Sequence, residues 1–76
     1  MNWNKEAEKI TKEFTFKNFT EALQFVNKVG ELAESMDHHP DILIHAYKKV
    51  SISLTTHSKG GLTDKDYQLA EKIDNI

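Results

Sequence analysis

The chain has few of the residues that cross-link, break or anchor a protein: no cysteine, one proline and three glycines. Without cysteine it can form no disulfide, and thiol catalysis and zinc–thiolate sites are excluded. The longest apolar run, residues 42–44, is much too short to cross a membrane. No apolar stretch near the N-terminus has the length of a secretion signal. We therefore expect a cytoplasmic protein without membrane contact.

Positive charge is also limited, since ten Lys and Arg stand against twelve Asp and Glu, for a formal net charge of −2. The cations are scattered and form no stripe that could follow a nucleic-acid backbone, so we expect no nucleic-acid partner. The length predicts one domain over residues 1–76. Such a domain buries only about 60% of its unfolded surface. Self-association, as a homodimer or homotetramer, is the available source of further stability.

Alternation of apolar and polar residues over 10–17 predicts a strand with one solvated face. Its apolar side carries Ile10, Phe14 and Phe16, interrupted once by Lys12. Before it, Trp3 is expected to begin a short partner strand, with residues 4–9 as the connection.

From Asn18 the apolar period changes to three and four residues, which predicts a helix. Asn18 and Glu21 make a start similar to a capping box, and Pro40 forces the helix to end near Asp37. The expected apolar stripe consists of Phe19, Ala22, Leu23, Val26, Val29, Leu32, Ala33 and Met36.

Residues 41–57 alternate again and predict two antiparallel strands joined by a tight turn at Lys48 and Lys49. Two glycines then precede a last helix, which begins after its N-cap Thr63 and ends near Asp74. The order strand, strand, helix, strand, strand, helix predicts an α+β two-layer sandwich. Both helices are expected on one face of an antiparallel sheet of about four strands.

Histidine is the residue type that is unusually dense, with four in the chain and two of them adjacent. His38 and His39 lie at the end of the first predicted helix, where free carbonyls favour an imidazolium that can deliver a proton. Glu34 is one helical turn before His38 and is expected to orient its ring. His57 ends a strand that antiparallel pairing can bring back toward this helix end.

Each of these residues also has a purely structural interpretation. Two histidines before a proline can be a polar helix terminus, and His45 is expected at the surface. Asp66 lies three residues after Thr63 and fits the second half of a capping box better than a chemical role. Tyr47 fits a strand aromatic that covers the sheet. A metal site built from Glu34, a histidine of the pair and His57 is a further alternative.

Taken together, these positions resemble the signature of the pterin-4a-carbinolamine dehydratases. That signature has an acidic residue, three spacers, His-His-Pro, an aromatic residue, a later histidine and a downstream Asp. Six residues separate Pro40 from Tyr47 where the family more often has five, which suggests a bulge. The matching residues in this sequence are Glu34, His38, His39, Pro40, Tyr47, His57 and Asp66.

The resemblance implies a hydro-lyase that removes the 4a-hydroxyl of a tetrahydropterin to give the quinonoid dihydropterin, and so recycles the pterin. It implies a pterin as the small-molecule substrate, no cofactor and no metal, and a dimer or tetramer as the usual assembly. The implied catalytic residues are His38, His39 and His57. The residues implied to bind or orient the substrate are Glu34, Asp37, Pro40, Tyr47 and Asp66.

Two or three imidazoles fit this chemistry, because the leaving hydroxyl needs a proton and the neighbouring ring nitrogen must lose one. We expect His38 and His57 to transfer the protons, with His39 positioning the substrate or sharing that role. The alternative belongs to another functional class: a non-catalytic member of the same family that binds a protein partner and regulates it, as some members do by stabilising transcription-factor dimers.

Overall fold

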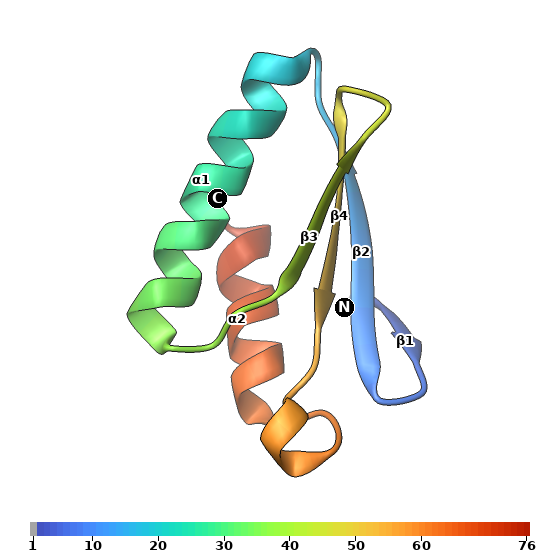
Figure 1. Cartoon of the computed structure of the whole chain (residues 1–76), viewed down its shortest axis with the longest axis vertical. Helices are drawn as coiled ribbons and strands as arrows, with labels where there is room; N and C mark the ends of the chain where they lie inside the picture. The colour runs from blue at the N-terminus through green and yellow to red at the C-terminus, as the bar shows by residue number, and fades with distance from the viewer. Residues whose placement is uncertain (1) are drawn as a thin grey trace.

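Strands and helices follow one another in the predicted order in the computed structural model, which describes residues 2–76 and every side chain among them except that of His57. Figure 1 shows both α-helices on the same face of one sheet. The α+β two-layer sandwich is therefore confirmed. The elements are β1 (Asn4–Glu6), β2 (Lys9–Thr15), α1 (Phe19–Met36), β3 (Asp41–His45), β4 (Lys49–Leu54), the short 3₁₀ helix η1 (His57–Lys59) and α2 (Asp64–Asp74).

The sheet is antiparallel throughout, with the strand order β1-β2-β4-β3. Val50 pairs with Phe14 and Ile44, and Ile52 pairs with Ile42, so the apolar residues of the central strands share one face. Glu13 pairs with Ser51 on the opposite, polar face. This alternation buries one side of the sheet against the helices and leaves β3 as an edge strand.

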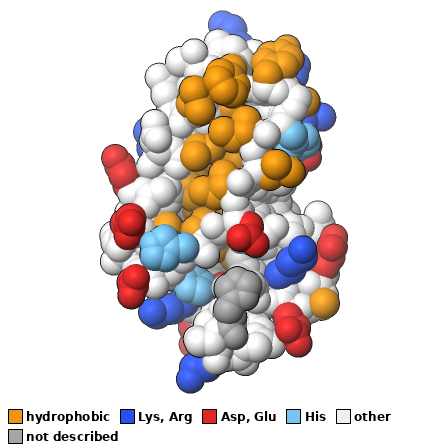
Figure 2. All heavy atoms as spheres, viewed as in Figure 1, with side chains coloured by type: hydrophobic (Ala, Val, Ile, Leu, Met, Phe, Trp, Pro, Cys, Tyr) orange, Lys and Arg blue, Asp and Glu red, His pale blue; other side chains and the backbone are white. Residues whose placement is uncertain are grey.

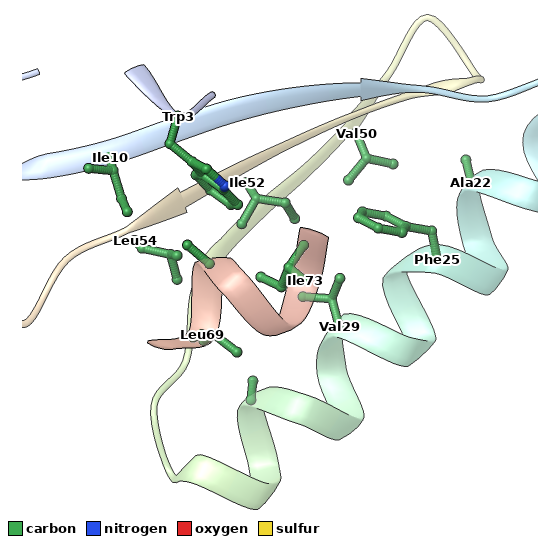
Figure 3. Packing of buried hydrophobic residues seen from close by; sticks show 12 residues of the cluster. Trp3, Ile10, Ala22, Phe25, Val29, Val50, Ile52, Leu54, Leu69 and Ile73 are labelled. Carbon is green, nitrogen blue, oxygen red and sulfur yellow. The ribbon is translucent and has the colours of Figure 1, made fainter. Parts of the chain in front are cut away.

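The core lies between the sheet and the two helices, as Figure 3 shows. Val29 of α1 and Leu69 and Ile73 of α2 are fully or almost fully buried together with Ile52 and Leu54 of β4. Because α1 and α2 both pack on β4, the end of α1 and the start of α2 are held close to each other. No helix in the described part of the chain is long and apolar enough to span a membrane.

The buried stripe of α1 is rotated from the predicted one. Phe25, which the stripe omitted, is 7% exposed, whereas Phe19 and Leu23 are 48% and 40% exposed. Phe25 packs against the strand-side aromatics Phe14 and Phe16, with ring centroids 4.7 and 4.9 Å away. Contact with these rings therefore decides which side of the helix faces the sheet, and helical spacing alone did not contain that information.

The N-terminal strand lies one residue beyond the position predicted for it. β1 occupies Asn4–Glu6, inside the segment predicted to be a connection, and the turn to β2 is formed by Ala7 and Glu8. Trp3 precedes the strand and is buried at 7% exposure. Its indole N–H donates to Asp74 at 3.0 Å, and Lys12 bonds the other oxygen of the same carboxylate at 2.7 Å. The start of the chain is thus attached to the end of α2.

The β3–β4 turn also differs from the prediction. It is formed by residues 46–48, earlier than the predicted Lys48 and Lys49, and Ala46 and Tyr47 have positive φ angles of 48° and 52°. Residues 41–45 pair one to one with 49–53, so the strands contain no bulge and the additional residue lies in the turn. Tyr47 is 62% exposed in this turn and does not cover the sheet.

Ile52 provides a test of the core, because it is fully buried in the central strand β4. Replacing Ile52 by Val removes one methylene and should lower the free energy of unfolding by about 1 kcal/mol. Urea denaturation measures this change, with exposed Gln24→Ala as the matched control. An unchanged midpoint for Ile52→Val would show that this side chain is not closely packed.

Candidate active site

The end of α1 turns His38 toward the protein interior. Asp37 adopts the left-handed conformation, with φ 50° and ψ 44°. Its N–H donates to the carbonyl of Glu34 at 3.2 Å, and the N–H of His38 donates to that of Ala33 at 3.1 Å. This is the Schellman pattern of helix termination, with Asp in the position usually held by Gly. Asp37 therefore reverses the chain through its backbone, and Pro40 follows before β3 begins.

His38 contacts Asp66 across the gap between the two helices. Its Nε2 lies 2.6 Å from Oδ1 of Asp66, and the two residues are 9% and 0% exposed. An ionised carboxylate can only accept hydrogen bonds, so the ring nitrogen that faces it carries the proton. In the neutral ring, Nδ1 then holds the free lone pair. Nδ1 is therefore the ring nitrogen of His38 that can still accept a proton.

Asp66 is ionised despite its burial because several donors surround it. Oδ2 accepts the backbone N–H of Thr63 at 2.9 Å and the hydroxyl of Thr56 at 2.8 Å. Burial by itself raises the pKa of Asp66, but the hydrogen bonds from His38, Thr63 and Thr56 outweigh this effect and hold the pKa below its ordinary value. The predicted capping role is present, but it is only part of what this carboxylate does. Asp66 also fixes the ring of His38.

Glu34 contacts His39 and not His38, contrary to the prediction from helical spacing. Its Oε2 lies 3.3 Å from Nε2 of His39, and both side chains are largely exposed, at 78% and 57%. The i to i+4 relation holds only within a helix, and α1 ends at Met36, before either histidine. The adjacent histidines therefore differ in environment: His38 is buried on a carboxylate, and His39 faces solvent.

The backbone of His57 begins the 3₁₀ helix η1, and β4 ends earlier, at Leu54. The prediction that His57 ends a strand was therefore wrong. A pair of backbone hydrogen bonds between Thr56 and Gly61, at 3.2 and 3.3 Å, closes the loop that carries it. The side chain of His57 lies outside the described residues, so its predicted approach to His38 stays a prediction.

Tyr47 is not close to His38 within one chain. It occupies the turn at the opposite end of β3 from Pro40, as Figure 1 shows for the β3–β4 turn and the end of α1. His45, predicted to be a surface residue, is on the polar face of the sheet, where its Nε2 lies 3.1 Å from Glu13 and 3.3 Å from Ser51. His45 is therefore separate from the His38–Asp66 pair.

Among residues 2–76, with the His57 side chain left out, no three His, Asp or Glu residues are grouped closely enough to hold a metal ion. The metal site considered from the sequence also includes His57, whose side chain lies outside the described residues.

A surface groove of about 390 Å³ lies between the two helices, but its lining, which includes Lys28, Leu32 and Ile76, contains none of the predicted site residues.

One partner of Asp66 in this cluster, Thr56, had not been identified from the sequence. Thr56 is partly buried in the segment that follows β4, and its hydroxyl contacts both Asp66 and, at 2.8 Å, the hydroxyl of Thr63. Thr63 had been recognised as the helix N-cap that forms a capping box with Asp66, and its N–H does donate to Oδ2. The capping-box spacing thus gave one partner of the carboxylate, whereas no sequence signal pointed to Thr56.

Comparison with known proteins agrees with the fold and with the signature. A family model described as pterin 4 alpha carbinolamine dehydratase matches residues 1–76. A protein of Picosynechococcus sp. that bears the name pterin-4-alpha-carbinolamine dehydratase is 55% identical over 97% of this chain and 79% of its own length. One of the same name from Sulfolobus acidocaldarius is 49% identical over 97% of this chain and 80% of its own length.

Solved structures show the same architecture. A transcriptional coactivator/pterin dehydratase from Brucella melitensis superimposes with a TM-score of 0.89 at 39% identity, over 96% of this chain and 79% of its own. A pterin dehydratase-like protein described as a RuBisCO assembly factor in the alpha-carboxysome gives a TM-score of 0.81 at 20% identity, over 99% of this chain and 88% of its own. At that identity the second likeness concerns the fold alone.

The lowered pKa of Asp66 predicts a specific dependence of stability on pH. The folded state binds the Asp66 proton more weakly than the unfolded chain does, because the pKa of an Asp carboxyl in an unfolded chain is about 3.9 and folding lowers it. Stability from this group is therefore fully present above that value and is lost as the pH falls through the lower, folded pKa. Urea denaturation between about pH 5 and pH 2.5 should give a shallower pH dependence of the unfolding free energy for Asp66→Asn than for the wild type.

Asp64→Asn is the matched control, because Asp64 is an exposed carboxylate in the same first turn of α2. Equal pH slopes for Asp66→Asn and the wild type would contradict the buried, hydrogen-bonded state of Asp66.

Proposed function

Because this chain belongs to the pterin 4 alpha carbinolamine dehydratase family, we propose that it is a hydro-lyase that converts 4a-hydroxytetrahydropterin to quinonoid dihydropterin and water. The observation that carries the proposal is the buried His38–Asp66 pair, at 2.6 Å, directly beside the exposed His39. Close relatives that bear the dehydratase name over 97% of the chain support the same substrate class. The product would return to the pterin pool for reduction.

The reaction needs two proton transfers and no redox step. The bond between C4a and the hydroxyl oxygen breaks, and the oxygen leaves as water after it receives a proton. N5 loses its proton, and the electron pair of that N–H bond forms the new double bond between N5 and C4a. A general acid and a general base placed on the two atoms are sufficient, and imidazoles can serve as either near neutral pH.

We assign one proton transfer to His38, through Nδ1, because Asp66 already occupies Nε2. His57 is assigned the other transfer on the strength of the family signature. His39, steered by Glu34, positions the substrate at the exposed side of the site. Asp37 and Pro40 contribute by fixing the chain reversal that aims His38. Asp66 orients His38 and keeps its tautomer, a role that resembles the carboxylate partner of other catalytic histidines.

A stopped-flow assay on freshly generated 4a-hydroxytetrahydropterin tests the proposal. His38→Gln is the informative variant, because the Gln amide can still donate to buried Asp66 but cannot exchange a proton at pH 7. Its turnover, and that of His57→Ala, should fall by about 100-fold or more. His45→Ala removes a histidine on the opposite face of the sheet and should retain wild-type turnover.

Two outcomes would contradict this function. A folded wild type that does not accelerate dehydration at all would favour the alternative, a protein-binding member of the family. A His38→Gln protein with full turnover would remove His38 from the chemistry and leave the family function to other residues. Circular dichroism of each variant separates loss of catalysis from loss of folding.

We also propose that the protein is a homodimer, or a homotetramer built from such dimers, with the edges of β3 paired antiparallel. β3 is an edge strand of the described sheet, and its central residue Leu43 is 59% exposed. An exposed apolar edge strand tends to pair with another strand. Figure 2 shows hydrophobic side chains gathered on the face between α1 and β3, which supports a contact on this side of the molecule.

The sequence of β3 is complementary to itself. Antiparallel pairing of two copies about Leu43 sets Asp41 opposite His45 of the partner subunit and Ile42 opposite Ile44 of the partner subunit. A carboxylate therefore meets an imidazole, and apolar residues meet apolar residues, in one register. In this register the β3–β4 turn of the partner subunit, which carries its Tyr47, lies at the end of β3 that follows His39 and Pro40. The aromatic residue of the family signature, distant from His38 and His39 within one chain, would then border the site of the other.

Leu43→Arg sets two like charges against each other at the centre of this pairing and should shift the protein to monomers in sedimentation velocity. Gln24→Arg, an exposed cation on α1, should leave the assembly unchanged. Tyr47→Ala should keep the dimer but raise KM, because it removes an aromatic contact with the substrate. A Leu43→Arg protein with wild-type mass in solution would reject β3 as the interface.

A further inference from the structure

We propose that Thr56 is a positioning residue for the dehydration: its hydroxyl holds the carboxylate of Asp66, which in turn holds the ring of His38. This inference rests on the proposed function for its kinetic consequence. The geometric consequence, a more weakly held His38–Asp66 contact when Thr56 is changed, is independent of any substrate.

The direction of the hydrogen bonds follows from the carboxylate. Asp66 is ionised and can only accept, so the hydroxyl of Thr56 must donate to Oδ2, at 2.8 Å. A hydroxyl has one proton, so Thr56 can only accept in its second contact, and Thr63 donates to it at 2.8 Å. One chain of hydrogen bonds therefore runs from Thr63 through Thr56 to Asp66.

Thr56 is itself held rigidly by its backbone. Its N–H and carbonyl both bond Gly61, and the same carbonyl also accepts the N–H of Lys59 at 3.1 Å. The residue thus fixes the end of the segment that follows β4 and the closure of the loop that begins with His57. A rigid donor can restrict the rotation of the carboxylate that it contacts, which a donor on a mobile side chain cannot do.

The two oxygens of Asp66 have different partners, and this difference gives Thr56 its importance. Oδ1 faces His38 at 2.6 Å, whereas Oδ2 is held by Thr56 and the N–H of Thr63. Removal of the Thr56 hydroxyl leaves Oδ2 with the backbone N–H of Thr63 as its donor. The carboxylate plane is then free to rotate about that bond, and the direction of the His38 ring becomes less defined.

The test compares Thr56→Val with Thr56→Ser and Thr55→Val. Thr55 is the adjacent residue, and its hydroxyl donates to the carbonyl of Glu8 at 2.6 Å, outside the His38–Asp66 cluster. Thr55→Val therefore removes one hydroxyl from the same segment without touching Asp66. Thr56→Ser keeps the hydroxyl and should retain the wild-type behaviour.

Two measurements are made on each protein. The Nε2 proton of His38, buried against a carboxylate, should give a low-field proton NMR signal, and its exchange with water should be about tenfold faster in Thr56→Val, the loss of one hydrogen bond to a charged group. In the stopped-flow assay, kcat of Thr56→Val should fall about tenfold with KM nearly unchanged, since positioning acts on the proton transfer. Thr55→Val should alter neither quantity.

The two measurements separate this inference from the dehydratase function. If the wild type lacks dehydratase activity, the proposed function fails, and the exchange rate of the His38 proton still decides the role of Thr56. An exchange rate in Thr56→Val equal to that of the wild type overturns the inference, whatever the kinetics. A Thr56→Val protein whose kcat equals that of Thr55→Val overturns the kinetic part.

Discussion

The burial of the Asp66 carboxylate is the constraint on which the site depends. A charge removed from water is tolerated only when hydrogen-bond donors replace the water, and Asp66 has no exposed surface. Three donors from different parts of the chain converge on it: the ring of His38, the hydroxyl of Thr56 and the backbone N–H of Thr63. Burial of this carboxylate therefore requires three segments to meet at one point: the end of α1, the segment after β4 and the start of α2.

The arrangement of the helices supplies the electrostatic setting for this convergence. α1 ends and α2 begins at the same end of the sandwich, as Figure 1 shows. The free N–H groups at the start of α2 stabilise the carboxylate of Asp66. Trp3 and Lys12 bind Asp74 near the other end of α2. The helix that carries Asp66 is therefore held by side-chain contacts near both of its ends.

The order of strands and helices could be predicted from the sequence, because the spacing of apolar residues along the chain shows which side of each element is buried. It failed where a long-range contact decided between local options. The spacing of Glu34 and His38 suggested a helical pair, but the left-handed Asp37 ends that relation before His38. The partner of His38 is Asp66, 28 residues away in the chain. Phe25 became a core residue through contact with the aromatics of β2 and the segment after it. No local spacing encodes either contact.

The edge strand β3 bears on two features of the single chain: its exposed apolar side chains and the position of Tyr47. A domain of 76 residues buries little surface, and Leu43 and Tyr47 remain 59% and 62% exposed. The aromatic residue of the family signature, Tyr47, also lies at the opposite end of β3 from His38 and His39 of its own chain. In the proposed dimer, antiparallel pairing of β3 would bring the two copies of Leu43 together. It would also set the first residues of β3 in one subunit beside the last residues of β3 in the other. Assembly and completion of the site would then be one event, and dilution of the protein would weaken substrate binding before it unfolds the domain.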